Sequence, residues 1–280
     1  MGITSAGARF VSPLRAVRST VHMDPTGTPP VDFGRAAGDY ARHRAGFPRS
    51  FFARLSADGL AVAGARALDL GTGTGTVARG LTSLGLHVTG LDVSHDLLRA
   101  GRGLDSEAGP SGRRVVARAE RAPFSAGAFD LVVAGQCWHW FDGAAAAAEC
   151  MRLLRPRGVL VVAHFDYLAV PGNPAGATEE LVLAKNPTWP MAWSDGRYPR
   201  WRAHLEGAGF RDLRVTEWDE AVTYSHAAWR GRIRACNGVI ALRDQARIAS
   251  FDVEHAAVLR ASFPDPMVVP HRVWFLSARR

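Results

Sequence analysis

The chain has 280 residues, 47% of them hydrophobic, which is enough to bury a substantial core in one domain or in one domain with an insertion. The formal net charge is +8, but the basic residues are scattered and almost all are arginine, so composition favours no nucleic-acid partner. Three widely spaced cysteines without C-x-x-C spacing, and the lack of a long apolar run, indicate neither a metal site nor a membrane span and favour the cytoplasm.

Residues 1–30 are expected to lie outside the fold. They hold several arginines among Ser, Thr, Gly and Pro, contain no acid before Asp24, and lack the apolar stretch of a secretory signal. This composition fits a disordered leader or an extension from a start site upstream of Met23, with an organelle transit peptide as the alternative. We expect residues 31–280 to form a single domain.

Alternating helical and strand patterns from residue 47 onward predict an α/β fold with a doubly wound, mostly parallel sheet. The predicted strands are residues 65–70, 87–92, 114–118, 129–134, 159–165, 211–218 and 268–278. The predicted helices are residues 47–60, 76–84, 94–101, 144–154 and 201–206. A surface loop is predicted for residues 101–112, which are rich in Gly, Ser and Pro.

Two further stretches are predicted to be insertions that cap the mouth of the site. Residues 166–200 contain five prolines, and residues 225–262 have a largely helical pattern. The domain core is then expected over residues 47–165 and 200–280, with the second cap segment inserted into its last part.

The most informative segment is Ala67–Thr76, of sequence ALDLGTGTGT, where a buried strand runs into a glycine-rich turn. Such a turn lets the backbone approach a nucleotide, and the following helix presents unpaired N–H groups there. A dinucleotide site needs glycine at the first, third and sixth positions, but the sixth is Thr76. Instead, the acid Asp69 precedes the turn, and a second acid, Asp92, closes the next strand, where it can accept both hydroxyls of a ribose.

These residues resemble the class I S-adenosylmethionine-dependent methyltransferases. The resemblance implies a Rossmann-like, seven-stranded, mostly parallel sheet with helices on both faces. The matching segments are Asp69–Gly75, Gly90–Ser94, Ala119–Phe124 with Phe129–Val132, and Arg155–Gly158. Two more stretches, Tyr40–Pro48 and Ala134–Asp142, are similar to small-molecule methyltransferases related to trans-aconitate methyltransferase. The resemblance covers residues 33–165 well and the rest only in general architecture.

The resemblance implies S-adenosylmethionine as the cofactor. Gly71 and Gly73 would lie beneath its methionine and ribose parts, Asp69 near its amino group and Asp92 at the ribose diol. The other implied cofactor-binding residues are Tyr40, Arg44, Thr72, Val93, Ala119, Glu120 and Gln136.

Several of these assignments have a structural alternative. Arg118 stands where many relatives carry an acid, so either Glu120 or a backbone carbonyl would accept the adenine amine. Glu120 could instead be a solvated loop acid, and Tyr40 could simply pack over the sheet. Asp69 and Asp92 could be ordinary acids at strand ends.

Trp138-His139-Trp140 follows the fourth strand, at the edge where open α/β sheets bind ligands. His139 is the candidate catalytic base for a protonated acceptor, and the alternative is a spacer between two packing tryptophans. The candidate acceptor-binding residues are Trp138, Trp140, Trp189, Trp193, Arg197 and Tyr198. Arg197 could orient a carboxylate acceptor by bidentate pairing.

The expected function is methylation of O or N in a small, partly aromatic or carboxylate-bearing metabolite, with specialised biosynthesis suggested by analogy. The expected oligomeric state is a monomer or homodimer, and no metal is expected. One alternative is a non-methylating use of the same cofactor, such as cyclisation or transfer of another substituent. A less favoured alternative is nucleic-acid methylation, because the N-P-P-[FY] run of nucleobase methyltransferases is replaced by Gly135-Gln136-Cys137-Trp138. A non-catalytic cofactor-binding module and an NAD-dependent enzyme are the remaining rivals.

Overall fold

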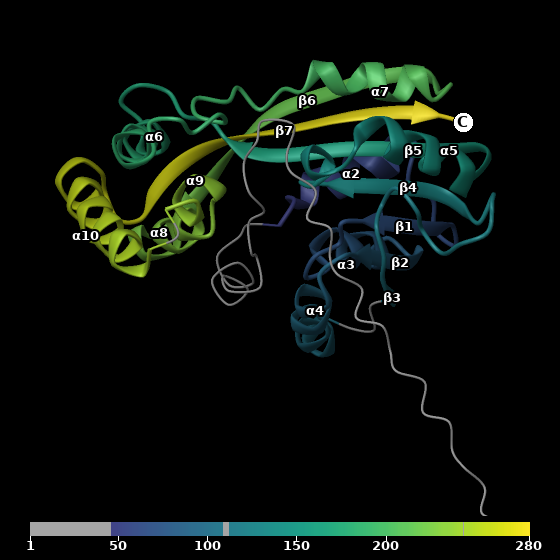
Figure 1. The fold of residues 1–280 in the computed structure, drawn as a ribbon, viewed down its shortest axis with the longest axis horizontal. Helices are drawn as coiled ribbons and strands as arrows, with labels where there is room; N and C mark the ends of the chain where they lie inside the picture. Colours follow the sequence, from purple (N-terminus) through teal and green to yellow (C-terminus); the bar gives the residue numbers. More distant parts are fainter. Residues whose placement is uncertain (1–45, 109–111, 243) are drawn as a thin grey trace, which may run out of the picture. The chain divides into compact units, whose positions relative to one another are not determined.

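In the computed structural model, which describes residues 46–108, 112–242 and 244–280, the chain builds a seven-stranded sheet of order β3-β2-β1-β4-β5-β7-β6 (Figure 1). The strands are β1 (Arg66–Leu70), β2 (His87–Asp92), β3 (Arg113–Val116), β4 (Phe129–Gly135), β5 (Leu154–Tyr167), β6 (Arg211–Tyr224) and β7 (Met267–Arg279). Neighbouring strands from β3 to β5 are parallel, and β7 runs antiparallel between β5 and β6. The predicted fold class is confirmed.

Helices cover both faces of the sheet because its strands carry apolar side chains on each side. The helices are α2 (Arg49–Ala57), α3 (Thr76–Ser83), α4 (His95–Ala108), α5 (Gly143–Leu153), α6 (Pro174–Lys185), α7 (Arg202–Gly207), α8 (His226–Arg234), α9 (Asn237–Ile240) and α10 (Gln245–Ser262). Buried residues of α2 and α3 join one apolar cluster, and those of α5 and α7 join a second. Of the helices in the described ranges, none has both the length and the apolarity needed to cross a membrane.

The loop predicted for residues 101–112 is wrong over residues 101–108, which continue α4. The glycine-rich composition is overridden by tertiary contacts of the helix. Asp105 of α4 pairs at 2.7 Å with Arg114 at the start of β3, whose side chain is only 5% exposed, and at 3.3 Å with Arg79. Because this ion pair is largely buried, the helix must extend far enough to supply the carboxylate.

The last two strands run well past the ends of the others and carry a group of helices with a core of their own. β6 and β7 stay paired as far as Tyr224 and Met267. There α6, α8, α9 and α10 gather around them, at the left of Figure 1. Pro174 suits the start of α6 because the first helical turn needs no N–H, and Asn173 caps it by accepting from the Gly176 N–H at 2.7 Å. We use the term cap for these four helices with the outer ends of β6 and β7.

Candidate active site

The glycine turn lies at the carboxyl end of β1 and directly precedes α3. Gly71, Gly73 and Gly75 all have positive φ, of 62°, 54° and 87°. Residues with a Cβ rarely adopt this conformation. The path of the backbone therefore requires glycine at each of these three positions. A Cβ added at Gly73 would meet nothing closer than Leu97 Cδ1 at 4.0 Å, so this part of the turn is open to a ligand.

Asp92, at the carboxyl end of β2, holds the glycine turn in place. Its Oδ2 accepts from the Gly73 N–H at 2.9 Å, and its Oδ1 accepts from the Ser94 N–H at 2.8 Å. Burial raises the pKa of Asp92, while these two N–H groups oppose that shift. The side chain is 9% exposed. The turn and the predicted ribose acceptor are thus one hydrogen-bonded unit.

Asp69 is turned into the protein at the end of β1. Its Oδ2 accepts from Thr72 Oγ1 at 2.6 Å and from the Ala78 N–H at 3.0 Å, which ties the turn to the first residues of α3. Burial raises the pKa of Asp69 to about 7, against the opposing effect of both hydrogen bonds. In this arrangement Asp69 shapes the turn, and Thr72 is its partner.

We expect replacement of Asp69 by Asn to change how stability depends on pH. Between about pH 4 and pH 7 the unfolded chain loses the Asp69 proton while the folded protein keeps it, so the free energy of unfolding falls as pH rises. At about 1.4 kcal/mol per pKa unit, the free energy of unfolding of the wild type should fall by up to about 4 kcal/mol across this range, relative to that of Asp69→Asn. Denaturant unfolding of both proteins from pH 4 to pH 8 checks this. Parallel pH profiles would contradict it.

The edge beside Asp92 has an apolar surface that suits a flat ring. Val93 follows Asp92 and is 65% exposed, whereas Ala119 is buried. Glu120 is already engaged, since its Oε1 accepts from the Asp142 N–H at 3.1 Å and its Oε2 pairs with Arg118 at 3.4 Å. These contacts leave a backbone group as the simpler acceptor for an adenine amine.

The end of β4 bends sharply behind the glycine turn. Gln136 has a positive φ of 64°, and its side-chain amide donates to the carbonyl of Phe165 on β5. Cys137 donates through Sγ to the Leu70 carbonyl at 3.0 Å. The amide of Gln136 thereby links the end of β4 to β5, while its predicted contact with the methionine end of the cofactor stays a prediction.

Of the aromatic cluster after β4, the structure buries Trp138 and leaves His139 and Trp140 partly exposed. Trp138 belongs to an apolar cluster and donates through Nε1 to His204 Nδ1 at 3.3 Å. The ring of His139 lies 4.7 Å from that of Trp140 and 5.4 Å from that of His164. His139 is therefore beside the end of β5.

The end of β5 carries a histidine–carboxylate pair that the sequence did not reveal. Asp166 Oδ2 lies 3.3 Å from His164 Nδ1 and accepts from the Tyr198 hydroxyl at 2.5 Å. Burial alone would raise the pKa of Asp166, but His164, Tyr198 and Arg232 outweigh it and hold this pKa well below its usual range. Tyr198 also stacks on Trp201 at 4.1 Å. His164 and Asp166 are neighbours on one face of β5, and only a long-range contact brings Tyr198 to them.

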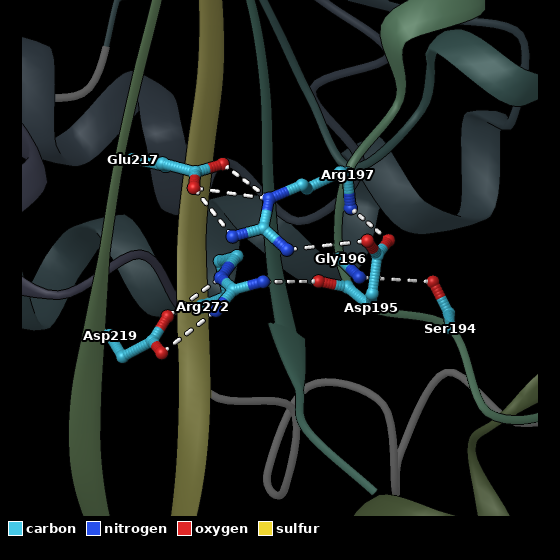
Figure 2. A network of polar contacts seen from close by, with 7 residues as sticks. All are labelled: Ser194, Asp195, Gly196, Arg197, Glu217, Asp219 and Arg272. Carbon is cyan, nitrogen blue, oxygen red and sulfur yellow. Dashed lines mark hydrogen bonds and ion pairs between the residues drawn. The ribbon is translucent and has the colours of Figure 1, made fainter.

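A network of ion pairs fixes the segment just before Tyr198 to β6 and β7, as Figure 2 shows; its members are Ser194, Asp195, Gly196, Arg197, Glu217, Asp219 and Arg272. Arg197 donates to Glu217 at 2.6–3.0 Å and also contacts Asp195. Arg272 binds Asp219 at 2.7 and 2.9 Å and donates to the Asp195 carbonyl at 2.9 Å. Arg197 is thus already engaged by two carboxylates.

The remaining predicted site residues are separated in space or lie beyond the described part. Trp189 packs against the apolar cluster of the cap, and Trp193 is 39% exposed. Tyr40 and Arg44 lie outside the described residues. The structure therefore brings together the glycine turn, Asp92 and the ends of β4 and β5.

The described ranges offer no metal site, and an open cavity in them lies away from the glycine turn. No group of three His, Cys, Asp or Glu residues there could hold a metal ion. An open cavity of ≈ 320 Å³ lies at the amino ends of β1 and β2, where Arg66 and His87 line it. Open α/β sheets bind ligands at the carboxyl ends of their strands, so the cavity is on the wrong edge for the cofactor.

Comparisons with known proteins show that the chain is similar to methyltransferases. A family model described as a methyltransferase domain matches residues 68–162. An uncharacterised methyltransferase of Mycobacterium tuberculosis is 36% identical over 130 residues, which are 46% of this chain and 50% of that protein. The chain thus spans about half the length of the first curated relatives that it matches.

A longer match and a solved structure extend the likeness. A demethylmenaquinone methyltransferase of Beutenbergia cavernae is 30% identical over 194 residues, 67% of this chain and 75% of that protein. A structure assigned as a type II methyltransferase, from Anaeromyxobacter dehalogenans, shares the fold, with a TM-score of 0.63 and 24% identity over 84% of this chain and 97% of that one. With its strand order and its glycine turn tied to Asp92, the chain belongs to the class I S-adenosylmethionine-dependent methyltransferases.

Proposed function

We propose that this protein transfers the methyl group of S-adenosylmethionine to an oxygen or nitrogen of a small-molecule metabolite. The observation that carries the proposal is the open glycine turn hydrogen-bonded to Asp92, at the edge where the ends of β4 and β5 also meet. The named activity of the Beutenbergia relative supports a small acceptor. A role in specialised biosynthesis and the narrower likeness to trans-aconitate methyltransferases are parts of the same proposal.

The residues at this edge fit the cofactor. Some of them would bind it, and His139 would remove a proton from the acceptor. When bound, S-adenosylmethionine supplies an activated methyl carbon, so orienting the acceptor accounts for most of the rate. Asp92 would hold the ribose, Gly71 and Gly73 would let the ligand lie close to the backbone, and the exposed Val93 would contact the adenine. His139 takes the proton of a hydroxyl or amine acceptor, with His164 and Asp166 beside it.

The proposal is tested by incubating the full chain with methyl-labelled S-adenosylmethionine and a small-molecule extract of the source organism. Label in a small product together with S-adenosylhomocysteine supports methyl transfer. Release of methylthioadenosine without S-adenosylhomocysteine would show a non-methylating use of the cofactor. Label transferred to RNA or DNA in a parallel incubation would instead support nucleic-acid methylation, and cofactor binding without any turnover would indicate a binding module.

We expect His139→Ala to lower the rate with a hydroxyl or amine acceptor by about tenfold at neutral pH. The loss is below the usual 100-fold effect of a general base because the partly exposed position lets water take the proton. As the acceptor ionises at high pH, the variant should regain the wild-type rate. A rate measured from pH 6 to pH 10 checks this, with Trp140→Phe as the packing control. A loss that is the same at every pH would assign His139 a packing role.

A further inference from the structure

Arg232 is a buried arginine on the inner side of the cap. It lies on α8, is 7% exposed, and its guanidinium carbon is 5.3 Å from the ring centroid of Tyr167 at the end of β5. Its Nη1 is 3.7 Å from Cys236 Sγ, and its Nε has no hydrogen-bond partner among the described residues. An arginine keeps its charge in proteins, so this site holds a buried cation.

The neighbouring arginines of α8 differ from Arg232 in their partners. Arg230 and Arg234 both bind Asp252 of α10. For Arg232, no carboxylate oxygen within the described ranges lies inside the 4.0 Å that defines an ion pair. A buried charge without a direct counter-charge is unfavourable, so the position indicates a partner that the chain itself does not supply.

The groups around Arg232 favour its charge, but no carboxylate among them in the described ranges pairs with it directly. Burial and the charge of Arg232 lower the pKa of His271 to about 3, so this histidine is neutral and accepts from the Tyr224 hydroxyl at 3.3 Å. Burial raises the pKa of Glu179, whose Oε1 accepts from the Tyr167 hydroxyl at 2.6 Å. The nearest influential anion, Asp166, is already bound by His164 and Tyr198.

Arg232 lies on the acceptor side of the candidate site. It contacts Tyr167, the last residue of β5. Tyr167 directly follows Asp166 and is three residues past His164, whose ring lies beside that of His139. β4 separates β5 from β1, which puts the two strands roughly 10 Å apart at about 4.8 Å per strand. Tyr167 also lies five residues beyond the level of Leu70, roughly 16 Å farther along at about 3.3 Å per residue. An acceptor anchored at Arg232 must therefore be extended, with its other end reaching back along the sheet toward the methyl group.

We propose that Arg232 binds a carboxylate of the methyl acceptor and that the methyl group goes to a different atom of that molecule. The inference rests on the proposed function and names its substrate class. One guanidinium matches one carboxylate in charge and in its two parallel hydrogen bonds. The buried position of Arg232 beside the ring of Tyr167 limits the access of water to such a pair, which strengthens it.

The test uses the full-length protein with methyl-labelled S-adenosylmethionine and the same small-molecule extract. The labelled product should bind an anion-exchange resin at pH 7 and lose that binding at pH 2, because a carboxylate is protonated there and a phosphate monoester is not. A product that is neutral at pH 7, or still anionic at pH 2, would overturn the proposal while leaving methyl transfer intact. Failure of every extract fraction to accept label would count against both proposals.

Variants then assign the carboxylate site to Arg232. Arg232→Met should raise the KM for the purified acceptor at least roughly 30-fold, with the affinity for S-adenosylhomocysteine unchanged, and Arg232→Lys should restore part of it. Arg230→Met, which removes an arginine bound to Asp252 from the same helix, is the matched control and should keep the wild-type KM. An unchanged KM in Arg232→Met would overturn the assignment. If that variant does not fold, Arg232→Lys and the charge of the product decide.

Discussion

Replacing Asp92 by alanine should weaken the binding of S-adenosylmethionine roughly 1,000-fold or more. Two hydrogen bonds from a ribose diol to a charged acceptor contribute about 2 kcal/mol each, and 1.4 kcal/mol is a factor of ten in affinity. The same change removes the acceptor for the Gly73 and Ser94 N–H groups, so the turn also loses its anchor. Calorimetric titration with S-adenosylhomocysteine measures the effect.

Two matched variants separate the contributions of Asp92. Asp92→Asn keeps an oxygen for the Gly73 N–H but loses the charge, and its affinity should lie between those of the wild type and Asp92→Ala. Asp96→Ala removes an exposed acid that pairs with Arg99 on α4, and it should bind normally. If Asp92→Ala bound the cofactor as tightly as the wild type, Asp92 would not belong to the site.

Gly71→Ala should both destabilise the protein and abolish most cofactor binding. Its Cβ would lie 2.7 Å from Cys137 Cβ and 2.8 Å from Cys137 Sγ, at a φ of +62°. The Cys137 Cβ is fixed to the backbone, so the turn or the end of β4 must shift. We expect a loss of about 1 kcal/mol for the backbone conformation and about 1–3 kcal/mol for the overlap. Denaturant unfolding and cofactor titration measure the two effects.

Gly59 offers a control for the loss of stability that comes from the backbone conformation alone. It has a φ of +66°, and a Cβ there would meet nothing within 4 Å. Gly59→Ala should therefore cost only the conformational part, about 1 kcal/mol, and should leave cofactor affinity unchanged. Equal losses of stability in the two variants, with normal binding in both, would show that the contact between the turn and β4 does not shape the site.

The sequence predicted the strands and the turn around the proposed cofactor site well because its signals are local. The strand, the glycine spacing and the acid at residue 92 all lie within one strand–turn–helix–strand unit, where the residue pattern reports directly on backbone conformation. The full length of α4 escaped prediction because a long-range ion pair, Asp105 with Arg114, stabilises it against its own composition.

The acceptor half was harder to predict because its contacts join distant parts of the chain. Tyr198 and Asp166 are 32 residues apart, and Arg232 reaches Tyr167 from a helix beyond β6. The sequence analysis singled out Arg197 as a carboxylate-binding residue and did not single out Arg232. Folding gives Arg197 two carboxylate partners on the surface and gives Arg232 a buried position.

The separate apolar cluster of the cap has an evolutionary consequence. Its buried residues come from α6, α8, α9, α10 and the outer ends of β6 and β7, and none of them belongs to the two clusters that flank the sheet. Substitutions there can change the cap without loosening the layers that support the glycine turn. Proteins that descend from one ancestor can in this way come to act on different acceptors while they keep the same glycine turn.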